Sequence, residues 1–373
     1  MARLPKTIPV LIHSYAEKFL KRNIESMGFE VRELPHDKDV ALGSGVTINI
    51  IAADGCDSEL CARFIGCPIE FSRSSGSWQI DTLCVVSDGD SVLVNQNDCP
   101  YELSKLLLPK IRSHYGKVDI LLHGFAGAGP YPQCFPQLTG RRLAEAVEHK
   151  KRSFLRQADN FIRDLRPRFH IPFAGQYTLS GRLSALDEQR GVAELAEAVE
   201  HFHNSSLGSN CVALESGITF DTEAPIPIYL PPDANLRRRY RDEVLSCQPF
   251  EFDSDLAPNN SEMQSLVTEA AKRLFRRQRE FGIKMDLCLL FDLDADFCAV
   301  ANLATQSLAI EKIEDAARSD HERLKIDPKL LHRILQGPKH AHWNNAEIGS
   351  HISFYRNGDF NRHASNLINY FHA

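Results

Sequence analysis

The sequence lacks several features that would identify a class of protein directly. None of its ten cysteines forms a CxxC pair, and only two tryptophans and four methionines occur in 373 residues. The cysteines Cys84, Cys211, Cys288 and Cys298 lie inside apolar patterns, which is typical of buried thiols and not of a disulfide framework. No apolar run is long enough to cross a membrane, and no signal-type apolar core follows the first residues. We therefore expect a cytoplasmic protein without a membrane partner.

The charge balance also excludes a class of partner. Lysine and arginine number 43 against 49 aspartates and glutamates, which gives a net charge of -6. Such a chain shows no electrostatic preference for nucleic acid or for an anionic membrane. With 43% hydrophobic and 25% charged residues, the composition is that of a globular protein.

Length and local pattern predict two domains of the α/β class. A chain of 373 residues exceeds the usual size of one hydrophobic core. The polar stretch 253–260 is a plausible linker, so we predict one domain over 1–255 and a smaller α/β domain over 256–373. Strands and helices alternate through the first two-thirds of the chain. The elements that the pattern predicts include strands over 83–86, 92–94, 118–122, 169–174 and 211–220, and helices over 13–27, 101–114, 140–165, 261–281 and 328–335.

One carboxylate stands out at the end of a predicted hairpin. Two apolar runs flank an Asp-Gly step at Asp88 and Gly89, which favours a tight turn between antiparallel strands. The second run breaks into a polar cluster that ends at Pro100, and this cluster holds Asp98. An acid at a sheet edge can reach a metal ion or a substrate. A solvated turn acid is the alternative.

Other motifs are incomplete. The loop 124–129 is rich in glycine but matches neither GxGxxG nor the phosphate loop, so it indicates close backbone approach instead. His123, at the end of the preceding strand, is a candidate for chemistry or a core histidine. The acidic run 292–296 lacks the glycine and glutamate of a calcium loop. Cys56, Cys61 and Cys67 are too irregularly spaced to predict a zinc site.

Four strings together resemble a known family. They are Ile80-Asp-Thr-Leu-Cys-Val-Val-Ser-Asp-Gly with Asn97-Asp98-Cys99, Gly127-Ala-Gly-Pro-Tyr-Pro132, Ile171-Pro-Phe-Ala-Gly175 and Trp343-Asn-Asn-Ala-Glu-Ile-Gly-Ser-His351. As a set they are similar to the metallo-β-lactamase superfamily, in the branch near cytidine monophosphate-N-acetylneuraminate hydroxylase and the ascorbate-phosphate lactonases.

The resemblance implies a fold and a metal site. The fold is an αββα sandwich of two sheets with outer helices, and the site is a dinuclear centre at the sheet edges. In this pattern Asp98 matches the bridging aspartate, and His123 and His170 are the nearby imidazoles. Zinc would suit hydrolysis, and iron would suit oxygen activation.

The chain departs from the family at its signature. It has no HxHxDH string, so we expect a sandwich that lacks its first strands. One aspartate and two histidines make a poor dinuclear site, and we expect at most weak binding of one metal ion.

Three functions follow from the resemblance. The first is an oxygen-dependent hydroxylase with a dinuclear iron site, supplied with electrons by an external donor. The alternative is a zinc-dependent hydrolase of an ester, lactone or phosphoester, and the third is a catalytically incomplete binding or scaffold protein. A small molecule is the expected substrate and a homo-oligomer the expected assembly. The residues expected to contact the substrate are Tyr131, Gly175, Arg182, Trp343 and His351.

Overall fold

The chain folds into two compact units in a computed structural model that describes residues 4–15, 18–52, 81–205, 210–215, 217–316 and 320–373. The first unit comprises Met1–Gly127, Arg152–Gln176 and Ala193–Pro231. The second comprises Ala128–Lys151, Tyr177–Val192 and Pro232–Ala373. The division expected near residue 255 lies inside the second unit. The mixed α/β class expected from the sequence is confirmed, with several sheets in the two units.

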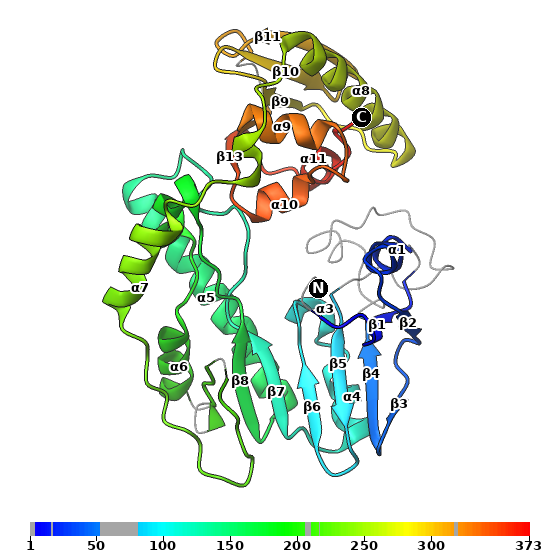
Figure 1. The fold of residues 1–373 in the computed structure, drawn as a ribbon, viewed down its shortest axis with the longest axis vertical. Coiled ribbons are helices and arrows are strands. Elements are labelled where there is room, and N and C mark those ends of the chain that lie inside the picture. The colour runs from blue at the N-terminus through cyan, green and yellow to red at the C-terminus, as the bar shows by residue number, and fades with distance from the viewer. Residues whose placement is uncertain (1–3, 16–17, 53–80, 206–209, 216, 317–319) are drawn as a thin grey trace. The chain divides into compact units, whose positions relative to one another are not determined.

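A six-stranded sheet forms the first unit, in the order β3-β4-β5-β6-β7-β8 (Figure 1). Neighbours from β3 to β6 are antiparallel, whereas β6, β7 and β8 run parallel. The strands are β3 (Val40–Gly43), β4 (Val46–Ile51), β5 (Leu83–Ser87), β6 (Val92–Asn95), β7 (Ile120–Gly124) and β8 (Phe169–Ala174). The parallel pair β1 (Val10–His13) and β2 (Val31–Leu34) forms a separate small sheet.

The predicted hairpin is confirmed as β5 and β6. Leu83, Val85 and Ser87 alternate with partly exposed residues along β5, as a strand with one buried face requires. Gly89 takes a φ of 91° in the turn, and the Asp88 carboxylate accepts hydrogen bonds from the backbone N–H groups of Asp90 and Ser91. The sequence therefore fixes this turn locally.

Helices of the first unit differ from the sequence-based prediction at two places. The predicted helix 13–27 begins later, because residues up to His13 belong to β1. The predicted helix 101–114 is two helices separated by residues 105–107. The helices are α1 (Phe19–Ser26), α3 (Tyr101–Ser104), α4 (Leu108–Tyr115), α6 (Leu195–Asn204) and the carboxy-terminal part of α5 (Gly140–Leu165).

The predicted strand over 211–220 is wrong. Among the described residues of this range, only Cys211 pairs with the sheet, through a single bridge to His170. The chain then turns, since Gly217 has a φ of 87° and the Ile218 N–H donates to the Glu215 carbonyl. Extended geometry cannot continue through such a turn.

The second unit is built on a five-stranded sheet in the order β11-β10-β9-β12-β13. All neighbours are antiparallel except β9 and β12. The strands are β9 (Cys288–Asp292), β10 (Phe297–Asn302), β11 (Ser307–Lys312), β12 (His321–Ile326) and β13 (Ile352–Asn357). The helices are α7 (Ala234–Tyr240), α8 (Asn260–Glu280), α9 (Pro328–Leu335), α10 (Trp343–Ile348), α11 (Arg362–Ile368) and the amino-terminal part of α5.

The core of the second unit follows from the pattern of α8. Val267, Ala270, Ala271 and Leu274 recur at helical spacing and are at most 2% exposed.

Short 3₁₀-helices span Gly181–Gln189 and Glu251–Ser254, and a π-helical turn spans Arg241–Leu245. In the part of the chain that the structure describes, no helix combines the length and apolarity that crossing a bilayer requires.

Substituting Phe291 should destabilise the second unit. Its ring is fully buried and stacks on Phe371 with centroids 3.8 Å apart. Phe291→Ala should lower the free energy of unfolding by about 3–5 kcal/mol, because it removes packing and leaves a cavity. Guanidinium unfolding followed by Trp343 emission in a Trp78→Phe background measures the change. Phe297→Ala, at a site 41% exposed, is the control and should cost less than about 1 kcal/mol.

Candidate functional site

The strongest cluster of functional groups lies in the second unit, where the segment around Arg190 packs on helix α5. Gly191 has a φ of 64°, and a Cβ there would lie 3.0 Å from both the Lys150 Cβ and the Val147 carbonyl oxygen. Only glycine combines this conformation with this approach. The contact brings Arg190 next to Lys150. We call Gln133, Cys134, Lys150, Tyr177 and Arg190 the Lys150–Arg190 cluster.

The Arg190 guanidinium is buried. Asp187 binds one of its edges, and the remaining nitrogen, Nη1, has no partner among the described residues. The Arg190 side chain is 8% exposed, and its Nε lies 2.9 Å from Asp187 Oδ1. Its Nη2 donates to Asp187 Oδ2 at 3.1 Å. Asp187 is itself fixed by the Leu179 N–H at 2.8 Å. Arg190 Nη1 is buried and has no hydrogen-bond partner among the described residues, which is costly for a charged donor.

Lys150 is the cation of the cluster that no carboxylate of the described residues contacts. Its ammonium donates to the Tyr131 carbonyl at 2.8 Å, and no carboxylate of the described residues pairs with it. Burial, followed by the charge of Arg190, lowers the pKa of Lys150 to about 8. The ammonium is therefore still mostly protonated at neutral pH.

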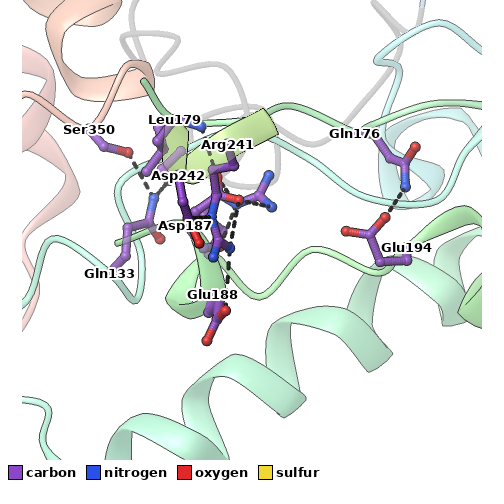
Figure 2. Close-up of polar contacts among 11 residues, drawn as sticks. Gln133, Gln176, Leu179, Asp187, Glu188, Glu194, Arg241, Asp242 and Ser350 are labelled. Carbon is purple, nitrogen blue, oxygen red and sulfur yellow. Dashed lines mark hydrogen bonds and ion pairs between the residues drawn. The ribbon is translucent and has the colours of Figure 1, made fainter. Parts of the chain in front are cut away.

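Tyr177 and Gln133 add a neutral donor and an acceptor. The Arg190 guanidinium lies 4.9 Å from the centroid of the Tyr177 ring. Gln133 Nε2 donates to the Gly129 carbonyl at 2.6 Å and to Ser350 Oγ at 2.9 Å (Figure 2). A carbonyl can only accept, so the amide orientation is fixed. Tyr177 Oη and Gln133 Oε1 are both buried without a hydrogen-bond partner in the described part of the chain.

The six charges around the cluster sum to zero, but Lys150 itself has no carboxylate partner among the described residues. Asp187 balances Arg190, while Arg241 pairs with Asp242 at 2.8 Å and with Glu188 at 3.3 Å (Figure 2). The Cys134 thiol lies close by, and burial raises its pKa to about 11, so it stays neutral. Burial also raises the pKa of Tyr177. The cluster can therefore hold a monoanion through three donors.

His123 and His170, which the sequence predicts as metal ligands, are in contact in the first unit. Leu121 pairs with His170 across the parallel strands β7 and β8, and His123 lies two residues further on the same face. His123 Nε2 lies 3.1 Å from His170 Nδ1, and the Phe202 ring packs edge-on against both. Both rings are at most 1% exposed. Burial, followed by His170, lowers the pKa of His123 to about 3.

These residues fit two positions of one metal ion, but they do not fit a dinuclear centre. Two nitrogens about 2.0 Å from one zinc ion lie roughly 3.3 Å apart in tetrahedral geometry, close to the observed 3.1 Å. Across the described ranges, no three His, Cys, Asp or Glu side chains gather as a metal site. Asp98 is exposed, and its charge adds to burial in raising the pKa of Asp81. Cys56, Cys61 and Cys67 lie outside the described residues.

The residues expected to contact substrate have separate environments. Tyr131 is 42% exposed and joins the cluster through its carbonyl. Arg182 and His351 come together at Phe250, 4.8 Å from its ring centroid in each case. Trp343 is 2% exposed and its indole N–H donates to the Phe371 carbonyl. Gly175 has a φ of 124°, and a Cβ there would lie 2.5 Å from the Ala126 backbone. The roles of these residues stay predictions.

Two comparisons found no match in sequence: no family model matches, and neither does any curated protein. Among solved structures, the chain is similar to CmlA, a diiron β-hydroxylase from Streptomyces venezuelae, with a TM-score of 0.32 and 15% identity over 55% of this chain. It spans 38% of that protein. An isothiocyanate hydrolase from Delia radicum gut bacteria has a TM-score of 0.35 and 12% identity, covering 58% of this chain and 68% of that one. The function must be argued from the residues of this chain.

Sequence reasoning missed all five residues of the cluster: Gln133, Cys134, Lys150, Tyr177 and Arg190. Lys150 stands in the run His149-Lys150-Lys151-Arg152, which has the pattern of a solvated helix face. Gln133, Tyr177 and Arg190 belong to no motif. Their common surroundings arise from the close approach at Gly191, and no spacing along the chain shows it.

Gly191→Ala should destabilise the second unit and displace Arg190. The methyl group meets the α5 backbone and forces a positive φ on alanine, so the free energy of unfolding should fall by about 2–3 kcal/mol. Gly140→Ala is the control, since Gly140 has a φ of 52° with open space around its Cβ position. Its cost should be only about 1 kcal/mol. Denaturant unfolding of both variants measures the difference, and equal losses would contradict the steric argument.

Proposed function

We propose that the chain binds a small molecule bearing an oxyanion, through Lys150 and Arg190 of the second unit. One observation carries the proposal: two adjacent cationic side chains, one without a counter-charge and one with a buried unpartnered N–H. Buried charges are normally paired and buried donors normally bonded. An anion would satisfy both groups at once.

The surroundings support binding of a ligand and not only internal packing. Lys150 is only partly buried, so the ammonium end of the cluster can be reached from solvent. Arg190 is fixed by Asp187 and by the Tyr177 ring, so little side-chain entropy is lost on binding. Hydrogen bonds between such cations and an oxyanion are among the stronger ones in proteins.

This proposal corresponds to the third function expected from the sequence, a binding protein on a fold that resembles the metallo-β-lactamase superfamily. Membership of that superfamily is part of the proposal. Its support is the set of strings around Asp98, Gly127, Gly175 and Trp343, together with the mixed α/β architecture.

A metal-dependent enzyme of the same superfamily is the second candidate. It is favoured by the 3.1 Å separation of a ring nitrogen of His123 from one of His170. A metal ion held there would supply either an activated water for hydrolysis or, as iron, oxygen chemistry for hydroxylation. His123 and His170 would hold the ion in a dry environment beneath Phe202, which excludes bulk water.

Anion binding should depend on Lys150 and on pH. Acetate should bind the purified full-length chain most tightly below pH 8 and more weakly as pH rises through about 8, because Lys150 then loses its proton. Lys150→Met should weaken binding at pH 7 by about tenfold to a hundredfold and remove this pH dependence. Isothermal titration calorimetry at constant ionic strength measures both. The exposed Lys339 provides the control, Lys339→Met, which should bind as the unmodified chain does. No binding, or equal binding by both variants, would refute the proposal.

Metal content decides the second candidate. If it holds, the purified chain retains about one iron or zinc ion, and His123→Gln loses most of it, whereas the exposed control His203→Gln keeps it. Oxygen consumption that needs a reductant would then favour the hydroxylase over the hydrolase. Metal at background level in every variant would remove this candidate and leave anion binding unaffected.

A further inference from the structure

We propose that the ligand of the Lys150–Arg190 cluster is a small hydroxycarboxylate, whose carboxylate meets Lys150, Arg190 and Tyr177 and whose hydroxyl donates to Gln133. This inference rests on the proposed anion binding and adds the chemical class of the ligand. It depends on counting the charges and the open hydrogen-bonding positions of the five residues.

Charge favours a carboxylate over a phosphate. Lys150 is the one cation of the cluster that the described residues leave without a carboxylate partner. A carboxylate brings one negative charge, whereas a phosphate monoester brings about 1.5 to 2 at pH 7. The Nε–Nη2 edge of Arg190, which could hold a phosphate through two parallel hydrogen bonds, is already occupied by Asp187. A phosphate would therefore be left with excess charge beside Asp187.

The number of donors also matches a carboxylate. Arg190 Nη1 and Tyr177 Oη are buried and open, and the Lys150 ammonium uses one of its three N–H groups on the Tyr131 carbonyl. Because burial raises the pKa of Tyr177, its hydroxyl is a donor at neutral pH. Three donors on two carboxylate oxygens satisfy the ligand and the cluster together.

Gln133 selects a ligand that also carries a donor. Both amide N–H groups are taken by Gly129 and Ser350, so Oε1 can only accept, and it is buried without a partner in the described part of the chain. The Gln133 and Tyr177 side chains are also close enough to hydrogen-bond to each other, which lowers the pKa of the Tyr177 hydroxyl although burial outweighs this effect, and the ligand would replace this contact. A plain carboxylate leaves Oε1 unsatisfied, and a ligand hydroxyl satisfies it.

The same two cations select a hydroxyl over an amine. An amino group next to the carboxylate is protonated at neutral pH. It would stand near Lys150 and Arg190, whose mutual repulsion already contributes to the lowered pKa of Lys150. A second ammonium raises that repulsion, whereas a hydroxyl donates without charge.

Four small ligands test the inference: acetate, glycolate, glycine and inorganic phosphate. Dissociation constants are measured by calorimetry on the full chain at pH 7 and equal ionic strength. Glycolate should bind roughly threefold to tenfold tighter than acetate, as one added neutral hydrogen bond allows. Glycine and phosphate should bind more weakly than glycolate.

Substitution of Gln133 assigns the preference to its oxygen. Gln133→Met should reduce the glycolate-to-acetate ratio to about one while acetate still binds. The matched control is Gln176→Met, at an exposed residue of the first unit whose amide donates to Glu194 (Figure 2), and it should keep the preference.

The outcomes separate the two proposals. Equal binding of glycolate and acetate by the unmodified chain overturns the hydroxycarboxylate inference and leaves anion binding standing. Tighter binding of phosphate does the same and assigns a phosphate-bearing ligand. If none of the four ligands binds, both proposals fail. These comparisons use the unmodified chain, so they decide the matter even if Gln133→Met does not fold.

Discussion

The Lys150–Arg190 cluster depends on one buried ion pair, Arg190 with Asp187. The Asp187 carboxylate accepts from the Arg190 guanidinium and from the Leu179 N–H, and the Asp187 backbone carbonyl accepts from Arg190 Nε. Removing either charge would leave the other stranded in the interior, which usually costs about 3–5 kcal/mol. The pair closes the turn after the 3₁₀-helix Gly181–Gln189 and sets the position of Gly191 against α5. The whole Lys150–Arg190 cluster follows from this arrangement.

The two units differ in how their buried polar side chains are partnered. In the first, His123 and His170 form a closed pair within an apolar face, and burial keeps His123 neutral. In the second, cations are kept charged next to groups whose hydrogen-bonding capacity is incomplete within the described residues. A closed pair of imidazoles is compatible with packing alone, whereas a cation without a carboxylate partner calls for one. This difference is why anion binding ranks above metal chemistry.

Local rules explain which elements could be predicted. The hairpin of β5 and β6 follows from an Asp-Gly turn, and α5, β8 and α9 have the bounds expected from periodicity. Strand β12 was missed because buried Glu322, 3% exposed, breaks the apolar alternation and is neutralised by Arg356 at 2.7 Å from β13. Strand β11 was missed because it lies at the edge of its sheet and is largely exposed. In both cases the residues form a strand because of contacts with strands distant in sequence, which the local pattern does not show.

The contact between Gln133 and Ser350 has a consequence for the synthesis of this chain. The two residues are 217 positions apart in sequence, and the unit that contains them is assembled from three separate segments. Closing so long a loop is entropically costly, and contacts of this range slow folding. On the ribosome, residues 128–151 emerge well before their partners and must wait for the last quarter of the polypeptide. We therefore expect the unfinished chain to need chaperone protection during that interval. We also expect carboxy-terminal truncation to prevent the second unit from folding.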